Sequence, residues 1–124
     1  AINNMLLAVN LWAAAEGFST LKAHGVDLHG ALACINASSG RSMATEMVLP
    51  QRVLNRAFPT TFALDLLAKD TGIALDLVHS AKLPAPILAL TQSLFRAASD
   101  TAEPNSDFSA SVKMLERWTN ITLE

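Results

Sequence analysis

Four residues near the middle of the chain have a spacing that places polar chemistry on one face of a helix. Positions i, i+4, i+7 and i+11 of this stretch hold Asp65, Lys69, Gly72 and Asp76, and these positions face the same side of an α-helix. A glycine inside a helix costs about 1 kcal/mol relative to alanine, which suggests that another group approaches the backbone there. A lysine beside such a gap would donate to an amide, hydroxyl or phosphate of a ligand. The alternative is an exposed stripe with an Asp65–Lys69 surface pair, worth only about 0.3–0.5 kcal/mol.

Two other polar groups could hold a ligand. Asn3 and Asn4 open the most apolar helical stretch of the chain. A side-chain amide both donates and accepts hydrogen bonds, which suits a bound carboxylate or hydroxyl, although capping of the helix explains the two residues equally well. The run Ser-Ser-Gly-Arg-Ser at residues 38–42 could present backbone amides and a guanidinium to an anion. An ordinary turn between two helices is the alternative for this run.

Helices are expected to position all of these residues. The hydrophobic fraction is 51% and the aromatic fraction only 6%, so the apolar residues are mostly alanine and leucine, which favour helices over strands. The sequence shows no strand alternation. We therefore predict an all-α fold with a long first helix and four or five further helices, in one domain over residues 1–124.

Caps and prolines set the expected boundaries of the first three helices. The first helix covers Ile2–Ala23 and is apolar around nearly its whole circumference, so more than one neighbour should bury it. Asp27 is expected to cap the second helix. A third helix over residues 42–54 should be interrupted at Pro50, which cannot donate to the preceding turn.

Three further helices are expected after residue 59. Thr60 or Thr61 would cap the fourth, which ends near Lys82, and Pro86 would open the fifth at an allowed first-turn position. The last helix should follow the capping run Asn-Ser-Asp at residues 105–107. Its inward face is predicted to hold Phe108, Val112, Leu115 and Trp118.

Composition argues against several classes of function. The net charge is −2 and no basic block exists, whereas a nucleic-acid surface needs clustered Lys and Arg. Cys34 is the only cysteine, which rules out an internal disulfide and fits a cytoplasmic protein. His24, His29 and His79 lack ligand spacing, so no metal site is expected. The longest uncharged stretch, residues 1–15, is shorter than the roughly 20 residues of a membrane span, so no membrane partner is expected.

Four segments read Asn-Asn-Met-Leu-Leu at residues 3–7, Asn-Ala-Ser-Ser-Gly-Arg-Ser at 36–42, Lys-Asp-Thr-Gly-Ile-Ala-Leu-Asp at 69–76 and Asp-Phe-Ser at 107–109. Each is weak alone, but in this order and separation they resemble the C-terminal domain of the β-hydroxyacid dehydrogenase family, which includes 3-hydroxyisobutyrate dehydrogenase and tartronate semialdehyde reductase. The resemblance covers essentially the whole chain. It implies a helical domain of the 6-phosphogluconate dehydrogenase C-terminal type, placed after an N-terminal Rossmann domain with the active site between the two.

The same resemblance implies roles at the start of the chain and in the loop after the second helix. The family's catalytic lysine belongs to a Lys-x-x-Asn-Asn motif whose asparagines match Asn3 and Asn4, so the lysine is expected immediately before Ala1. Asn4 would act at the catalytic centre by holding the substrate. Asn3, together with Ser39 and Gly40, would bind substrate as well.

Cofactor contacts are implied for the fourth helix. Lys69 would reach the nicotinamide cofactor, with Asp70 beside it orienting local polar groups. Phe62 matches a position at which the family often has an aromatic residue near the cofactor. One departure stands in the loop after the second helix, where Met43 replaces the tryptophan that is frequent in the family.

For the full-length enzyme the resemblance implies NAD or NADP as cofactor, a short 3-hydroxy acid as substrate, and a homo-dimer or higher oligomer. The 124 residues contain neither the catalytic lysine nor a glycine-rich dinucleotide fingerprint, so we expect a fragment that is inactive without its own Rossmann domain. The alternative is a non-enzymatic ligand-binding and dimerisation module of a bacterial regulator, which the all-helical composition fits equally well.

Overall fold

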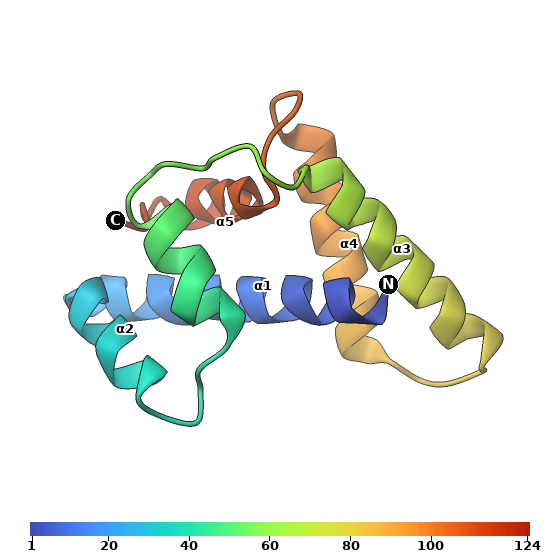
Figure 1. Ribbon diagram of the computed structural model, residues 1–124, viewed down its shortest axis with the longest axis horizontal. Helices are drawn as coiled ribbons and strands as arrows, with labels where there is room; N and C mark the ends of the chain where they lie inside the picture. Colours follow the sequence, from blue (N-terminus) through green and yellow to red (C-terminus); the bar gives the residue numbers. More distant parts are fainter.

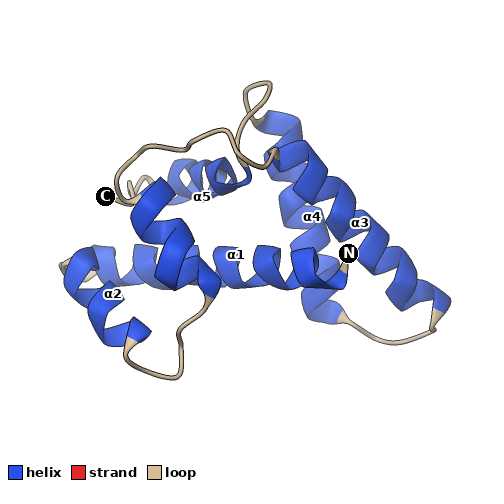
Figure 2. Ribbon diagram, in the orientation of Figure 1, coloured by secondary structure: helices blue, strands red, loops and turns tan.

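The computed structural model describes all 124 residues as helices joined by loops, with no strand (Figure 2). The α-helices are α1 (Ile2–Ala23), α2 (Leu28–Asn36), α3 (Leu64–Ser80), α4 (Pro86–Thr101) and α5 (Val112–Thr119). A π-helix, η1 (Ala44–Val53), and a 3-10 helix, η2 (Phe108–Ser111), complete the list. The predicted all-α class and the predicted bounds of the first helix are confirmed. None of the helices has the length and apolar character needed to cross a membrane.

Helix α1 is the central element of the fold. It runs through most of the length of the molecule (Figure 1) and contacts all four other α-helices as well as η1. Its almost wholly buried apolar side chains are Met5, Ala8, Leu11, Trp12, Ala15 and Phe18. The ring of Trp12 meets Phe95 of α4 edge to face, with 6.2 Å between centroids, a favourable geometry for aromatic pairs. The prediction that several neighbours bury the first helix is confirmed.

The cap predicted for α2 is also confirmed. The Asp27 carboxylate accepts a hydrogen bond from the Gly30 N–H at 2.8 Å, which satisfies one of the free amides in the first turn. The chain reaches this cap through Gly25, whose φ of +77° is a left-handed conformation that glycine adopts at little cost.

Pro50 does not interrupt the third helix, so that prediction is wrong. The segment Ala44–Val53 is a π-helix with Pro50 inside it, and in such a helix each N–H bonds the carbonyl five residues earlier. Pro50 has no N–H to reach the Thr45 carbonyl. That carbonyl accepts a bond from Asn36 Nδ2 at 3.0 Å instead. A side chain at the end of α2 thus replaces the hydrogen bond that the proline cannot make.

The caps predicted for the fourth helix are wrong as well. Helix α3 begins at Leu64, after Ala63, with no side-chain cap, so neither Thr60 nor Thr61 has that role. Thr61 instead donates its N–H to the Asp107 carboxylate at 3.1 Å, and Ala63 forms an isolated antiparallel bridge with Asp107. A contact with a distant segment therefore fixes the start of α3, where a local cap is expected from the sequence.

The prediction that Trp118 faces inward is wrong. Its side chain is 60% exposed, and its ring makes an edge contact with Trp12 at 5.7 Å between centroids. The other three residues of that predicted face, Phe108, Val112 and Leu115, are buried.

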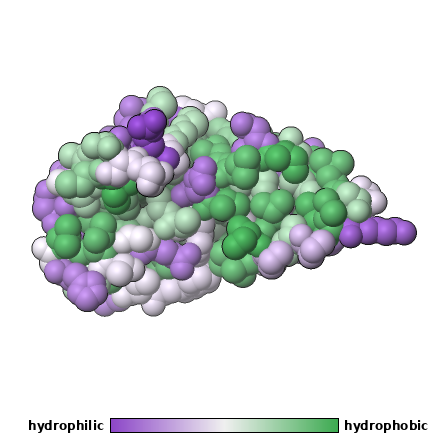
Figure 3. Space-filling model, turned by 90° about the horizontal axis from the view of Figure 1, so that it is seen from below, coloured by the Kyte–Doolittle hydropathy of each residue, from purple (hydrophilic) through white to green (hydrophobic).

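Apolar side chains also remain on the surface of α4. Pro86 opens this helix as predicted, and Phe95 is fully buried, but Ile87 and Leu90 are exposed. Figure 3 shows apolar residues spread over one end of the face that is seen from below.

Candidate active-site face

The first turn of α1 meets the middle of α3, and this contact joins two of the predicted site segments. Asn4 Nδ2 donates to Asp70 Oδ2 at 2.7 Å, although 66 positions separate the two residues. Asn3 Nδ2 donates in turn to Asn4 Oδ1 at 3.1 Å. Figure 1 shows the amino terminus beside α3. Three polar side chains from two helices thus form one group, which we call the amide–carboxylate cluster (Asn3, Asn4 and Asp70).

The cluster is partly removed from water. Asn4 and Asp70 are half-buried, whereas Asn3 is exposed. A partly desolvated carboxylate needs a donor, and the Asn4 amide supplies one. The two bonds also fix the orientation of the Asn4 side chain, because its nitrogen faces Asp70 and its oxygen faces Asn3. The cluster is therefore an ordered polar surface.

Lys69 faces a different direction from Asp70. It lies in an open groove of about 360 Å³ between α3 and α4, whose lining residues are Asp65, Ala68, Lys69, Gly72, Gln92, Arg96, Ser99 and Asp100. Lys69 is exposed. The chain has two ion pairs, Arg52–Asp107 and Arg56–Glu116, so the alternative of an Asp65–Lys69 surface pair is not realised.

Gly72 forms part of the wall of this groove, but nothing in the chain crowds it. A Cβ at Gly72 would have no heavy atom within 4 Å. Close approach by another part of the same chain therefore does not explain the glycine. Asp76 continues the polar stripe of α3 beyond the residues that line the groove.

The loop that contains Ser39 and Gly40 lies elsewhere. Figure 1 shows the connection between α2 and η1 well away from the amino terminus and α3. Both residues are exposed, and the Ser42 N–H bonds Thr45 Oγ1 at 2.9 Å within the turn. The chain thus does not bring Ser39 and Gly40 to the amide–carboxylate cluster.

Phe62 lies just before α3 and is half-buried. Its ring packs against that of Phe108 with 5.8 Å between centroids and a tilt of 48°. The Arg52 guanidinium lies over the Phe108 ring at 5.2 Å, within the range of a cation–π contact. Phe62 is thus held in place by a stack that begins in η1.

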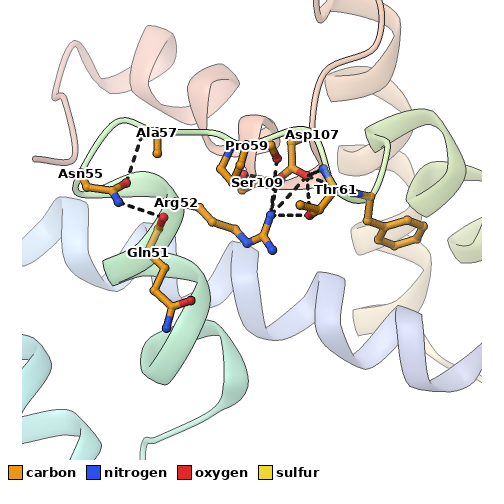
Figure 4. Close-up of polar contacts among 9 residues, drawn as sticks. Gln51, Arg52, Asn55, Ala57, Pro59, Thr61, Asp107 and Ser109 are labelled. Atoms are coloured by element: carbon orange, nitrogen blue, oxygen red, sulfur yellow. Dashed lines mark hydrogen bonds and ion pairs between the residues drawn. The ribbon is translucent and has the colours of Figure 1, made fainter.

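Asp107 is the buried hub of a network that we call the Asp107 clasp (Arg52, Thr61, Phe62, Asp107 and Ser109; Figure 4). Asp107 Oδ1 accepts the N–H groups of Thr61 and Phe62 at 3.1 Å each. Asp107 Oδ2 accepts the N–H of Ser109 at 3.2 Å, which caps η2, and the Ser109 hydroxyl as well. Arg52 Nη1 pairs with the carboxylate at 3.2 Å. The predicted cap at the last helical segment is confirmed, with additional partners.

The environment of Asp107 favours its ionised form. The side chain is fully buried, and burial by itself raises the pKa of a carboxyl. The hydrogen bonds from the Ser109 hydroxyl and from three backbone N–H groups outweigh burial, so the pKa of Asp107 lies below the ordinary 3.8. Bonds donated to a carboxylate stabilise its charged form. The clasp is thus a set of donors arranged around a negative charge.

Most contacts of the Asp107 clasp are not predicted from the sequence. Asp107 is expected only as a helix cap, and Arg52 is not expected at any site, because 55 positions separate the pair and no local spacing connects them. The single sequence signal was the Asp-Phe-Ser motif at residues 107–109. No group of three or more His, Cys, Asp or Glu side chains in the chain is arranged to hold a metal ion.

The sequence of the chain is similar to those of known dehydrogenases. Residues 1–115 match the family model described as the NAD-binding domain of NADP-dependent 3-hydroxyisobutyrate dehydrogenase. The chain is 30% identical over 122 residues to 2-(hydroxymethyl)glutarate dehydrogenase of Eubacterium barkeri, covering 98% of this chain and 40% of that protein. It is 27% identical to the mitochondrial 3-hydroxyisobutyrate dehydrogenase of Drosophila melanogaster, covering 93% of this chain and 37% of that protein.

Solved structures agree with these relatives. The 3-hydroxyisobutyrate dehydrogenase of Salmonella typhimurium superposes with a TM-score of 0.82 at 26% identity, covering 91% of this chain and 39% of that one. The Mycobacterium tuberculosis 3-hydroxyisobutyrate dehydrogenase crystallised with L-serine also gives a TM-score of 0.82, at 28% identity, covering 92% of this chain and 41% of that one. The chain thus spans about two fifths of the length of the proteins it matches.

Proposed function

Because the chain belongs to the family of NAD-binding domains of NADP-dependent 3-hydroxyisobutyrate dehydrogenase, we propose that it forms one wall of the active-site cleft of an enzyme that oxidises a short 3-hydroxy acid. Membership of this family supports the proposal that the chain is a domain of an NAD(P)-dependent hydroxyacid dehydrogenase. It favours this function over the alternative of a regulator module.

One observation carries the proposal: the hydrogen bond from Asn4 to Asp70 at 2.7 Å. It joins the pair of asparagines that resembles the family's catalytic motif to the Lys-Asp pair that resembles its cofactor motif. These two motifs are far apart in the sequence, and a shared site requires them to be close in space. A chain that only resembled the motifs by chance would have no reason to bring them together.

In this proposal Asn4 and Asn3 bind the substrate. The Asn4 amide, with its nitrogen held by Asp70, keeps a fixed orientation toward a bound hydroxyl or carboxylate, which lowers the entropic cost of positioning the substrate. The lysine of the Lys-x-x-Asn-Asn motif belongs one position before Ala1 and would take the hydroxyl proton as the general base.

Lys69, Asp70 and Phe62 would contact NAD or NADP. The fit rests on chemistry: Lys69 has no ion-pair partner in the chain, so its ammonium group is free to donate to a dinucleotide. When bound, the nicotinamide ring supplies the acceptor for the hydride that leaves the carbinol carbon of the substrate. Asp70, beside Lys69, would orient local polar groups, of which the Asn4 amide is one.

Substrate contacts by Ser39 and Gly40 have less support from the structure. The resemblance proposes them as substrate contacts, but their loop lies away from the amino terminus and α3 (Figure 1). We therefore do not expect them to contact the same substrate molecule as Asn4 of the same chain.

The remaining proposals concern the whole protein. We expect a Rossmann domain as the partner that holds the dinucleotide phosphates, and the cytoplasm as the compartment. A homo-dimer or higher oligomer is expected because large apolar side chains such as Leu83, Ile87 and Leu90 are more than 60% exposed. Sedimentation of a single monomeric species at high micromolar concentration would contradict the oligomer.

A dehydrogenase assay on the full-length protein tests the proposal. Short 3-hydroxy acids are screened with NAD and with NADP, and reduced cofactor is followed by its absorbance. We expect turnover with at least one acid, and none from residues 1–124 alone. Absence of turnover with every acid and both cofactors would contradict the proposed reaction, whereas turnover by the isolated 124 residues would contradict only the expected inactivity of this segment.

A further inference from the structure

No side chain caps α3, and the segment before η2 binds both the start of this helix and the two residues that lead into it. Helix α3 starts without a side-chain cap, although free amides at a helix start need acceptors. The Leu64 N–H bonds the Ser106 carbonyl at 2.8 Å, and the two residues before Ala63 donate their N–H groups to Asp107. The position of α3 along its axis therefore depends on the loop before η2.

The same contacts determine where the Phe62 ring lies. The Phe62 N–H donates to Asp107 Oδ1 at 3.1 Å, and its carbonyl accepts the Phe108 N–H at 2.7 Å. Both backbone groups of Phe62 are thus bound, one to Asp107, which caps η2, and the other to Phe108, the first residue of η2. Its ring then stacks on the Phe108 ring, so backbone and side chain are held by one neighbouring segment.

We propose that Asp107 is a positioning residue for the cofactor side of the site, because it holds residues 61 and 62 and so fixes the Phe62 ring and the register of α3. This inference rests on the proposed function, in which Phe62 and Lys69 contact the dinucleotide. Asp107 itself is fully buried, so its side chain is not available to substrate or cofactor. It acts through the backbone that it binds.

A second ion pair of the chain provides a control that distinguishes the positioning role of Asp107 from a general effect on stability. The second ion pair of the chain, Arg56–Glu116, has a similar form, with Nη1 and Oε2 2.7 Å apart and a Glu116 side chain that is 10% exposed. Glu116 also accepts the Leu123 N–H at 2.6 Å. This pair ties the loop after η1 to α5 and the carboxyl terminus, and none of its bonds reaches α3. Glu116→Gln is therefore a matched control that weakens an ion pair without freeing the cofactor side.

The experiment compares Asp107→Ala, Asp107→Asn and Glu116→Gln in the full-length enzyme. Three quantities are measured: the Kd for NAD(P) from quenching of tryptophan fluorescence, kcat with saturating hydroxy acid, and amide exchange of residues 60–66. We expect Asp107→Ala to raise the Kd about tenfold with a smaller change in kcat, since small misplacements of a positioning group are costly. Exchange at residues 60–66 should accelerate.

Asp107→Asn should have an intermediate effect on the Kd for NAD(P). Its amide oxygen still accepts the N–H groups of Thr61 and Phe62, so the Kd should lie between those of wild type and Asp107→Ala even though the ion pair with Arg52 is lost. Glu116→Gln should leave both the Kd and the exchange of residues 60–66 unchanged. If Asp107→Ala does not fold, the comparison of Asp107→Asn with Glu116→Gln decides the question.

Two results would overturn the inference and are distinguishable. Wild-type protein that binds no dinucleotide would overturn both this inference and the proposed function. Wild-type binding that weakens in Phe62→Leu but not in either Asp107 variant would leave the proposed function standing and remove only the positioning role of Asp107.

Discussion

Asn4 and Asp70 lie 2.7 Å apart, side chain to side chain, and join the first turn of the central helix to the middle of α3. The bond connects an uncharged donor to a half-buried carboxylate, a combination stronger than a bond between two neutral groups. It also sets the distance between the two parts of the proposed site. Its removal should therefore affect both stability and activity.

Asn4→Leu keeps the size of the side chain but leaves Asp70 without its donor. We expect a loss of about 1–3 kcal/mol in the free energy of unfolding, the usual cost of an unpaired, partly buried polar group, and a marked fall in dehydrogenase activity of the full-length protein. Urea unfolding and steady-state kinetics measure the two effects. Asn10→Leu, on the same helix at an exposed position, is the control and should change neither; an Asn4→Leu protein as stable as that control would argue against the bond.

Acid should weaken the Asp107 clasp. Because the folded-state pKa of Asp107 is below its ordinary 3.8, the contribution of this group to stability is fully present above 3.8 and is lost as the pH falls through the lower folded value. Asp107→Asn lacks that contribution at every pH. The difference in unfolding free energy between wild type and Asp107→Asn should thus be constant from pH 7 to 5 and shrink below pH 3.8. A difference that grows on acidification would contradict the assigned direction.

The bond that replaces the missing donor of Pro50 predicts a non-additive pair of substitutions. Asn36→Ala removes the side chain that bonds the Thr45 carbonyl and should cost about 1–2 kcal/mol. Pro50→Ala restores a backbone N–H at the position that the π-helix pairs with Thr45. In the double variant most of the cost of Asn36→Ala should disappear. Additive unfolding free energies in a double-mutant cycle would show that the two donors do not compete for this carbonyl.

The core should be most sensitive where α1 and α4 meet. Phe95 is fully buried and packs on Trp12, so Phe95→Ala should lower the free energy of unfolding by about 3–5 kcal/mol. Leu90→Ala, on the same helix but 62% exposed, should change it by less than about 0.5 kcal/mol. Equal effects of the two substitutions in urea unfolding would contradict the assigned burial of Phe95.

The sequence was informative where structure is local. The apolar circumference of α1 predicts a central helix, and Asp27 predicts a cap, because both depend on neighbours within one or two turns. The spacing of Lys69 and Gly72 likewise predicts a shared helical face, which the groove between α3 and α4 confirms.

Predictions failed where a distant residue supplied the hydrogen bond. At Pro50 the donor that the proline lacks comes from Asn36, which bonds the Thr45 carbonyl. Thr61 is not a cap because its hydroxyl accepts from Arg52 Nη1 and donates to Asp107, 46 positions away. Local propensity contains no information about such partners. The closeness of Asn4 and Asp70 is equally non-local, and only the resemblance to a family indicated that the two belong to one site.

The most direct test of the proposed site is the effect of Lys69→Ala on dinucleotide use by the full-length protein. Lys69 is exposed and unpaired, so its removal should not alter the free energy of unfolding by more than about 0.5 kcal/mol. Lys82→Ala, at an exposed position after the end of α3, is the matched control. We predict that kcat/KM for NAD(P) falls sharply in Lys69→Ala and stays unchanged in Lys82→Ala. An unchanged kcat/KM in both would place Lys69 on an ordinary solvent-exposed stripe and contradict the site.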